Sequence, residues 1–349
     1  MARATGRLTV DLAALRANYR QLIEAAAPGA CGAVVKANGY GFGAGPVSAG
    51  LWTWGARDFF VATVDEGVAL RETLPHARIF VFSGVDALNA QAAADHDLVP
   101  VINHTAQLDA WRSFAHHPIA VHIDTGMNRL GFDADEIRAR DFVGFEVALV
   151  MTHFACADEP DHPLNEIQLA RFSKARGVFA GVPSSIGNSA GTLSGHAGDL
   201  GRPGIGLYGG NPFVDRPNPM RPVATLEGEV LQLRHIKAGT SIGYGATYVA
   251  AGPRLIGIVG IGYADGLSRQ HSNLGAAAVD GERVPIVGRV SMDLTMVDVT
   301  DVGAAVGDWI EFIGTTVTVD EVAEGTNTIA YEILTGLGKR AEHIYLPVD

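Results

Sequence analysis

The stretch AVVKANGYGFGAG (33–45) joins an apolar run, a lysine and a series of glycines, and it introduces a pattern that continues for about 200 residues. Short apolar runs recur, each ended by turn residues and separated from the next by an amphipathic, helix-like segment. Strands that alternate with helices indicate a parallel sheet. Eight runs favour a closed barrel, although an open doubly wound sheet is the alternative. The runs are 31–37, 59–64, 78–84, 98–103, 119–124, 145–155, 184–189 and 202–209.

After about residue 222 the pattern changes to alternating apolar and polar residues with Gly and Asp turns, which is typical of β structure. The segment VDGERVP (279–285) predicts a hairpin, and TIAYEILTGL (328–337) predicts a short helix. The Pro-rich segment VDRPNPMRP (214–222) separates the two parts. We therefore expect an α/β protein with an N-terminal (β/α)8 TIM-like barrel in residues 1–222 and an all-β domain in residues 223–349.

Composition limits the partners and the location of the chain. Its 349 residues carry a formal net charge of −12 without a basic run, which argues against nucleic acid because the phosphate backbone would repel it. No segment reaches the roughly 18 apolar residues of a membrane span, and the N-terminus lacks a signal-peptide pattern. Two cysteines, Cys31 and Cys156, cannot build a disulfide framework. We expect a cytoplasmic protein that binds neither nucleic acid nor membrane.

Reactive groups of such barrels lie where strands end, and Lys36 ends the first apolar run. A lone lysine there could simply reach solvent. The glycines after it do not form a phosphate-binding P-loop, in which the lysine follows the glycines. A lysine in a dry cleft near other cations loses proton affinity and can form a Schiff base, for which pyridoxal phosphate is the natural aldehyde. Its phosphate could be held by the backbone of Gly204–Ile205 and by the hydroxyls of Ser189 and Tyr40.

Eight motifs follow one another in the order found in a known family. They are AVVKANGYGFG (33–43), DTGMNRLGF (124–132), MTHFA (151–155), GNSAG (187–191), RPGIGLYG (202–209), IGYGATY (242–248), IGYADG (261–266) and VGRVSMD (287–293). The chain thereby resembles the alanine racemases over essentially its whole length. The resemblance implies a barrel with pyridoxal phosphate at its mouth, a C-terminal β domain, and a homodimer whose two active sites each borrow residues from the partner.

The resemblance also implies roles for single residues. Lys36 would hold the cofactor and act as one catalytic base, and Tyr244 of the partner chain would be the other base. His153 would bridge Arg202 and Tyr244, and Arg202 would face the pyridine nitrogen. The remaining candidates are Tyr40, Asn188, Ser189, Gly204, Ile205 and Tyr331 for the cofactor, Arg129 and the backbone of Met292 for the substrate carboxylate, and Tyr263, Tyr331, Asp158, Arg269 and Arg289 along the entrance.

These residue types suit racemisation, which removes a proton from one face of Cα and returns it on the other. Two bases on opposite faces achieve this, provided that the pKa of each is lowered towards the working pH. Lowering the pKa of Tyr244 by about 2–3 units takes roughly 3–4 kcal/mol, which His153 backed by Arg202 could supply. An arginine can donate a hydrogen bond to the ring nitrogen without passing over a proton, which favours racemisation over transamination.

Two positions depart from the family's pattern. Many members have a carbamylated lysine two residues before DTGM, whose negative charge orients the substrate-binding arginine, but His122 stands there. We expect that His122, a bound anion or a neighbouring acceptor replaces the carbamate beside Arg129. Phe42 replaces a histidine that lies outside the proton-transfer set. The segment HFACADEPDH (153–162) lacks the paired spacing of a zinc site, so no metal is expected.

The leading prediction is an alanine racemase that supplies D-alanine for peptidoglycan or degrades it. The alternatives are barrel-type pyridoxal-phosphate decarboxylases, D-amino-acid aldolases or dehydratases, a cofactor carrier without catalysis, and a racemase for serine or a broader range of amino acids. Arg202 favours a racemase, because the decarboxylases have an acidic residue opposite the ring nitrogen, and the carriers lack a β domain. A gate of Tyr244, Tyr263 and Tyr331 favours a methyl-sized side chain.

Overall fold

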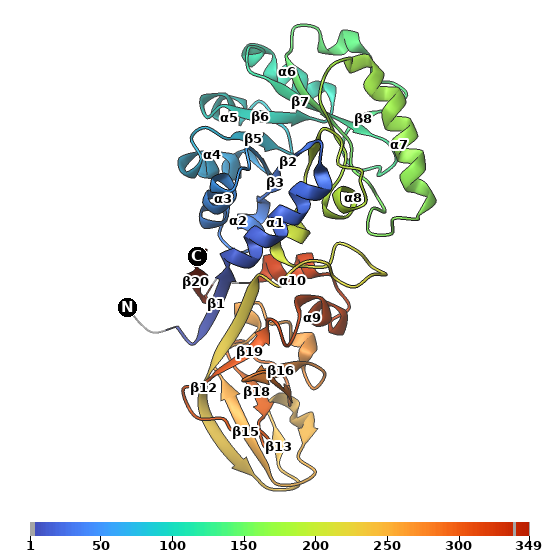
Figure 1. The fold of residues 1–349 in the computed structure, drawn as a ribbon. Helices are drawn as coiled ribbons and strands as arrows, with labels where there is room; N and C mark the ends of the chain where they lie inside the picture. The colour runs from blue at the N-terminus through green and yellow to red at the C-terminus, as the bar shows by residue number, and fades with distance from the viewer. Residues whose placement is uncertain (1–3, 338–339, 349) are drawn as a thin grey trace. The chain divides into compact units, whose positions relative to one another are not determined.

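The computed structural model describes residues 4–337 and 340–348, and the chain divides into two compact units (Figure 1). The barrel unit comprises residues 16–207 and 211–220, and the β unit comprises residues up to 15, 208–210 and those from 221 onward. The expected boundary at residue 222 falls near this joint. The N-terminal segment nevertheless groups with the C-terminal residues, because β1 (Gly6–Asp11) pairs with two strands of the β unit.

The barrel unit is built on one sheet in which seven strands run parallel in the order β10-β9-β7-β6-β5-β4-β3. A short strand, β8 (Phe132–Asp133), adds to β7. The strands are almost wholly buried, as expected for a parallel sheet covered on its outside. Their bounds are β3 (Ala33–Val34), β4 (Asp58–Val61), β5 (Arg78–Val81), β6 (Leu98–Ile102), β7 (Ile119–Asp124), β9 (Val147–Met151) and β10 (Ser184–Ser185).

An eighth strand position joins the two ends of this sheet. β11 (Leu200–Gly201) pairs in parallel with β2 (Ala30–Cys31), which continues into β3. The backbone N–H of Arg202 donates to the Gly187 oxygen beyond β10 (2.8 Å), and that of Val34 donates to the Pro203 oxygen (3.0 Å). These bonds connect the last strand to the first, so the TIM-like barrel predicted from the sequence is confirmed.

Helices alternate with the strands and lie outside them, and α3 to α6 follow β3 to β6 along one side of the sheet (Figure 1). Thr63 caps α4 by accepting from the Glu66 N–H, and a proline begins α7. The helices are α1 (Leu12–Ala26), α2 (Lys36–Tyr40), α3 (Ala44–Thr53), α4 (Val64–Thr73), α5 (Ala90–Asp95), α6 (Thr105–Trp111), α7 (Pro163–Ala175) and α8 (Ser189–Leu193). None of the described helices is long and apolar enough to cross a membrane.

The β unit is organised around β12 (Ala224–Ile236), a long strand whose pairing shifts register between Val230 and Gln232. Its first half pairs with β1 and β19, and its second half pairs with β15. The expected hairpin forms between β16 and β17, with Asp280 and Gly281 at positive φ in its turn. The other elements are β13 (Ser241–Ile242), β14 (Tyr248–Val249), β15 (Arg254–Val259), β16 (Ala276–Val279), β17 (Glu282–Pro285), β18 (Thr295–Asp298), β19 (Trp309–Ile313), β20 (Glu342–Leu346), α9 (Val319–Gly325) and α10 (Ala330–Gly336).

Candidate active site

A cavity of about 290 Å³ lies in the barrel unit, at the carboxyl ends of the strands, where the sequence predicts a site. It brings together four of the predicted site residues, namely Lys36, Arg129, His153 and Arg202. Its volume is close to that of the smaller pockets that take small ligands. The other residues that line it are Ala62, Phe82, Ser83, His122, Leu130 and Met151.

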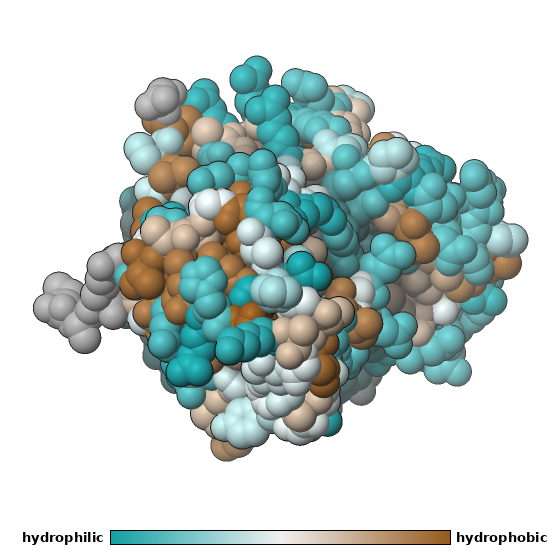
Figure 2. Space-filling view, turned by 90° about the horizontal axis from the view of Figure 1, so that it is seen from below, coloured by the Kyte–Doolittle hydropathy of each residue, from teal (hydrophilic) through white to brown (hydrophobic). Residues whose placement is uncertain are grey.

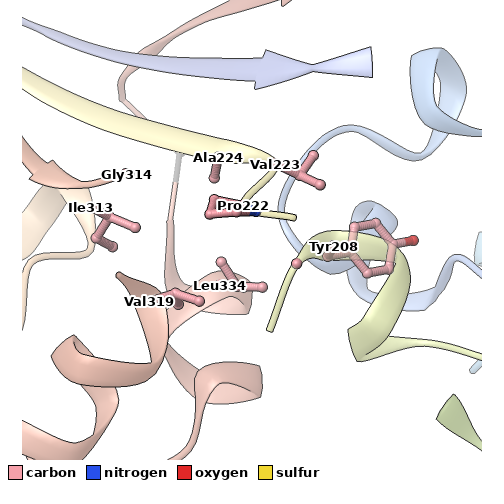
Figure 3. Close-up of a pocket in the computed structure, with 9 residues that line it drawn as sticks. Tyr208, Pro222, Val223, Ala224, Ile313, Gly314, Val319 and Leu334 are labelled. Atoms are coloured by element: carbon pink, nitrogen blue, oxygen red, sulfur yellow. The ribbon is translucent and has the colours of Figure 1, made fainter. Parts of the chain in front are cut away.

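The β unit contains a second cavity, but this one is of a different kind. It measures only about 10 Å³, and its wall is formed by apolar side chains and backbone around Pro222, Ile313 and Leu334 (Figure 3). A single water needs about this volume together with polar partners. The cavity is therefore a packing defect of the β unit and has no room for a substrate.

Lys36 opens a left-handed turn. Strand hydrogen bonding continues to Val35, whose N–H donates to the Phe60 oxygen (2.9 Å), and residues 37–40 then all have positive φ between 53° and 64°. Each non-glycine residue in this conformation costs about 1–2 kcal/mol. Asn38 offsets part of that cost, because its side-chain oxygen accepts from the Ala44 N–H (3.0 Å). Lys36, the residue before this turn, lines the cavity.

Glu66 on α4 holds this turn against the neighbouring strand. One of its carboxylate oxygens accepts from the Ala37 N–H and the other from the Ala62 N–H, both at 2.7 Å. Such charge-assisted bonds are stronger than those between neutral groups. Glu66 thereby ties the residue after Lys36 to a residue of the cavity wall, and it places a negative charge near the lysine amine.

Arg202 is fixed in the cavity wall although it is only 3% exposed. Its guanidinium donates to the Ser185 hydroxyl (2.5 Å) and to the main-chain oxygens of Thr152 (2.6 Å) and Ile186 (3.3 Å). A fourth contact joins it to Nδ1 of His153 at 3.4 Å. These four acceptors are uncharged, so they hold the guanidinium in place without neutralising its positive charge.

The contact with Arg202 also determines where His153 carries its proton. A guanidinium can only donate, so Nδ1 of His153 accepts and the ring proton is on Nε2. Gln168 on α7 fixes the segment around this histidine. Its Nε2 donates to the His153 main-chain oxygen (3.0 Å), and its Oε1 accepts from the Ala155 N–H (2.9 Å). His153 therefore presents an N–H donor on the side of the ring away from Arg202.

The cavity is electropositive and its histidines are neutral. Burial, followed by repulsion from Arg129, lowers the pKa of Lys36, whereas Glu66 opposes this shift. Burial and Arg202 lower the pKa of His122 to about 4 and hold that of His153 well below its usual value. Burial lowers the pKa of Arg202 to about 9, which leaves it charged at neutral pH. Such a cavity suits an anionic ligand and a reactive amine.

Two residues after Arg202, the chain forms a cluster of hydrogen-bond donors. The N–H groups of Gly204 and Gly206 point at the Ser189 hydroxyl oxygen, at 2.9 and 3.1 Å. The Tyr40 hydroxyl approaches Gly204 so closely that a Cβ there would clash with it. Backbone and hydroxyl donors of this kind bind phosphate groups. Ile205 stands between the two glycines in the sequence, and its side chain is buried.

Asn188, predicted to bind the cofactor, has a structural contact instead. Its side-chain oxygen accepts from the Gly191 N–H (2.9 Å) and caps α8, so it is used to begin the short helix that carries Ser189. Asp158 also lies in the barrel unit and its side chain is exposed. Neither residue lines the cavity.

The remaining predicted residues belong to the β unit, and none of them lines the cavity in the barrel unit. Tyr244 is 72% exposed, Met292 52% and Tyr263 42%. Figure 2 shows one face of the molecule, on which hydrophobic residues form groups between hydrophilic ones. The other predicted residues of this unit are Tyr331 and Arg269, which are both exposed, and the half-buried Arg289, whose guanidinium lies beside Gly245.

Sequence reasoning missed several residues that shape the cavity. Asn103 and Gln107 form a buried amide pair behind His122. Asn103 directly follows the apolar run of β6, so the rule on strand ends could have identified it. Glu66 stands three residues after Thr63, a spacing that suggests only a helix cap. Among the residues that the structure describes, no group of three or more His, Cys, Asp or Glu side chains could hold a metal ion.

Both units match models of known domain families. Residues 10–212 match the N-terminal domain of alanine racemase, and residues 223–345 match its C-terminal domain. The chain belongs to the alanine racemase family. Curated alanine racemases of Rhodospirillum rubrum and Jannaschia are 46% and 47% identical to it, over 98% and 99% of the chain and 96% and 100% of the relatives. Agrobacterium fabrum has a biosynthetic and a catabolic alanine racemase, each 44% identical over 98% of this chain and over 94% and 92% of their own lengths.

Solved structures of alanine racemases share this fold over nearly the whole length of the chain. The crystal structure from Bartonella henselae, with covalently bound pyridoxal phosphate, superimposes with a TM-score of 0.92 at 36% identity, covering 99% of this chain and 100% of that one. The biosynthetic alanine racemase of Pseudomonas aeruginosa gives a TM-score of 0.89 at 35% identity, over 99% and 100% of the two chains. The similarity to alanine racemases therefore extends over both units.

Proposed function

We propose that this protein interconverts L- and D-alanine with pyridoxal phosphate held by Lys36. One observation carries the proposal. In a chain of the alanine racemase family, a lysine with a lowered pKa shares one cavity with two arginines and two neutral histidines. A lysine of this kind can attack an aldehyde, and the arginines can bind an anionic amino acid.

The residues present fit pyridoxal phosphate. The Ser189 hydroxyl accepts from the N–H groups of Gly204 and Gly206, so its own O–H would donate to the phosphate, and the Tyr40 hydroxyl, which lies against Gly204, would contribute beside it. When bound, the cofactor supplies an electron sink for the charge left on Cα after its proton is removed. Arg202 would donate a hydrogen bond to the ring nitrogen and keep its own proton there, because arginine stays charged at neutral pH.

Two bases would move the proton of Cα. Lys36, with its lowered pKa, would exchange a proton at Nζ on one face of the substrate. Tyr244 of a second copy would do so at its hydroxyl on the other face. The proton on Nε2 of His153 is available for a hydrogen bond to that hydroxyl, which would favour the tyrosinate form. Arg129 and the backbone N–H of Met292 would bind the substrate carboxylate.

A second copy of the chain would complete the site. Tyr244, Tyr263 and Met292 are large side chains on one unit, and all three are more than a third exposed. Exposed aromatic and methionine side chains are typical of protein interfaces. We infer a homodimer in which these residues serve the partner's cavity. The unpaired Cys31 and Cys156 suit a reducing compartment such as the cytoplasm.

Borohydride reduction tests the proposal. The purified protein should absorb visible light from its bound cofactor, racemise alanine, and yield after reduction a pyridoxyl-modified peptide that contains Lys36. Lys36→Ala should abolish all three, whereas Lys174→Ala, which removes an exposed lysine paired with Asp135, should change none. A modified peptide elsewhere, or none, would contradict the assignment. Carbon dioxide release or faster turnover of serine would favour the decarboxylase or serine racemase alternatives.

A further inference from the structure

Behind the cavity wall lies a chain of buried amides that ends at His122. Asn103 is 2% exposed, and its side-chain oxygen meets Nδ1 of His122 at 2.9 Å. His122 itself lines the cavity together with Arg129. This arrangement decides which nitrogen of the His122 ring carries its proton.

The orientation of the Asn103 amide follows from its other partners. Its nitrogen donates to the main-chain oxygens of Val101 (2.8 Å) and Phe82 (3.1 Å), which can only accept. Turning the amide over would place oxygen against oxygen at both contacts. The Asn103 oxygen must therefore face His122, and because that oxygen can only accept, Nδ1 of His122 must carry the proton.

Gln107 on α6 holds Asn103 in turn. Its side-chain oxygen accepts from the Asn103 main-chain N–H (2.7 Å), and its side-chain nitrogen donates to the Ser83 oxygen (2.7 Å). Both contacts involve backbone groups with a single role, so the orientation of the Gln107 amide is also determined. The series Ser83, Gln107, Asn103, His122 is thus a directed chain of hydrogen bonds.

The neutral state of His122 leaves Nε2 as an acceptor. Burial and the charge of Arg202 lower the pKa of His122 and keep the ring neutral at physiological pH, although Asp124 opposes them; Arg129 adds a smaller effect in the same direction as Arg202. With the proton on Nδ1 towards Asn103, the lone pair of Nε2 is on the opposite side of the ring, which is the side left for the cavity. Arg129 lines the same cavity and is exposed, and it makes no hydrogen bond or ion pair with another described residue.

We propose that Gln107 and Asn103 are positioning residues that fix His122 as a neutral acceptor for the guanidinium of Arg129. Arg129 would then donate one guanidinium N–H to Nε2 of His122 and others to the substrate carboxylate. The first bond would fix the angle at which the carboxylate binds. An uncharged acceptor orients the guanidinium and leaves its whole charge for the substrate. This inference rests on the proposed function for the role of Arg129, but the protonation state of His122 does not depend on it.

The protonation state is measured first, without any activity assay. In protein labelled with ¹⁵N-histidine, the ¹⁵N shifts of His122 should show a protonated Nδ1 and an unprotonated Nε2, with His122→Gln identifying the signal. Asn103→Leu should release the ring towards the Nε2-protonated form that predominates in water. Nε2 protonated in the unmodified protein would overturn the inference, whether or not the protein racemises alanine.

Kinetics test the positioning role. His122→Phe and Asn103→Leu should each raise the KM for alanine about 10- to 100-fold, the range expected for a lost hydrogen bond to a charged group, with a smaller change in kcat. Asn103→Leu made in the His122→Phe background should add little, because Asn103 acts through His122. Asn89→Leu, which removes an asparagine that holds the Asp86 N–H beside α5, serves as the matched control with unchanged KM. Additive losses in the double variant would overturn the proposal.

Discussion

The side chains of the cavity in the barrel unit and the exposed side chains of the β unit are held in opposite ways. In the cavity, Arg202 and His153 are buried and held by hydrogen bonds with defined partners. On the β unit, Tyr244 is 72% exposed and lies in a short turn with Gly245 at positive φ. One region binds and orients groups within a single chain, whereas the other presents its side chains to solvent.

This difference indicates which parts of the site one chain can build alone. A buried cation needs its acceptors in place when the chain folds, because an unpaired buried charge costs several kcal/mol. An exposed tyrosine needs no acceptors in place when the chain folds, because water solvates its hydroxyl. We therefore expect changes in the cavity to affect both folding and catalysis, and changes on the exposed residues to affect catalysis alone.

Tyr244→Phe should give the largest effect on turnover with the smallest effect on the cofactor. Loss of a proton-transfer group lowers kcat by about 10²- to 10⁴-fold, while reduction with borohydride should still trap the cofactor on Lys36. Circular dichroism and thermal unfolding should be unchanged, because the removed hydroxyl is on an exposed side chain. Loss of cofactor binding in this variant would show that Tyr244 has a structural role.

Mixed dimers give the sharpest test of a shared site. Lys36→Ala chains should have no activity and Tyr244→Phe chains very little, but co-expression in equal amounts should restore about a quarter of the normal activity if each site uses residues of two chains. That value follows because half of the dimers are mixed and each has one intact site of two. No recovery would contradict the contribution of Tyr244 from a partner.

The sequence predicted the residues that line the cavity better than the turn and the hydrogen bonds that hold them in place. Strand ends and motif order identified Lys36 and Arg202, because a parallel barrel brings the carboxyl ends of its strands to one face. The left-handed turn at 37–40 was not predicted, because alanine and tyrosine rarely adopt positive φ, as Ala37 and Tyr40 do here. Glu66 resembled a helix cap, and its bond to Ala37 joins residues 29 positions apart. Contacts of this kind depend on packing between elements, which local patterns do not contain.

Acid should destabilise the barrel unit through its neutral histidines. The pKa of His122 is about 4 when folded, against an ordinary value of 6.5, so the unfolded chain binds a proton first as the pH falls. The stabilisation is complete above about pH 6.5 and is lost towards pH 4, and a shift of this size amounts to about 3 kcal/mol. His153 acts in the same direction.

Denaturant unfolding at several pH values measures this effect. His122→Gln cannot take up the proton, so its free energy of unfolding should fall less steeply between pH 6.5 and 4 than that of the unmodified protein. His235→Gln, which changes an exposed histidine of the β unit, should keep the original slope. Equal slopes for all three proteins would show that His122 is already accessible to protons in the folded state.

Arg202, the proposed partner of the ring nitrogen, should give a smaller but more specific effect. Arg202→Glu should slow racemisation about 10- to 100-fold, the range for a lost charge-assisted hydrogen bond. It should also raise transamination, measured as pyruvate formed per racemisation event, because a carboxylate there favours a protonated ring. Arg202→Lys keeps a charged donor and should slow the reaction without raising transamination. Unchanged partitioning in Arg202→Glu would defeat the assignment, provided that circular dichroism shows a folded protein.

Arg340 should have the smallest effect, and it tests how the exposed residues are positioned. Its guanidinium binds both oxygens of the buried Asp265 (2.9 and 2.8 Å) and one oxygen of Asp293 (2.7 Å). It thus joins the turn after Tyr263 to the turn that contains Met292, whose main-chain oxygen accepts from the Ala264 N–H (3.0 Å). Tyr263 and Met292 can therefore be positioned while exposed, because hydrogen bonds and ion pairs hold the two turns that carry them.

Arg340→Met should therefore raise the KM for alanine by only about two- to fivefold, since partly exposed ion pairs contribute up to about 1 kcal/mol. Amide hydrogen exchange should rise in residues 262–266 and 291–294. Arg283→Met removes a comparable bidentate pair with Glu321 in the same unit and should leave both measurements unchanged. If both variants behave alike, Arg340 does not position the exposed residues; if only Arg340→Met loosens them, the β unit positions them within a single chain.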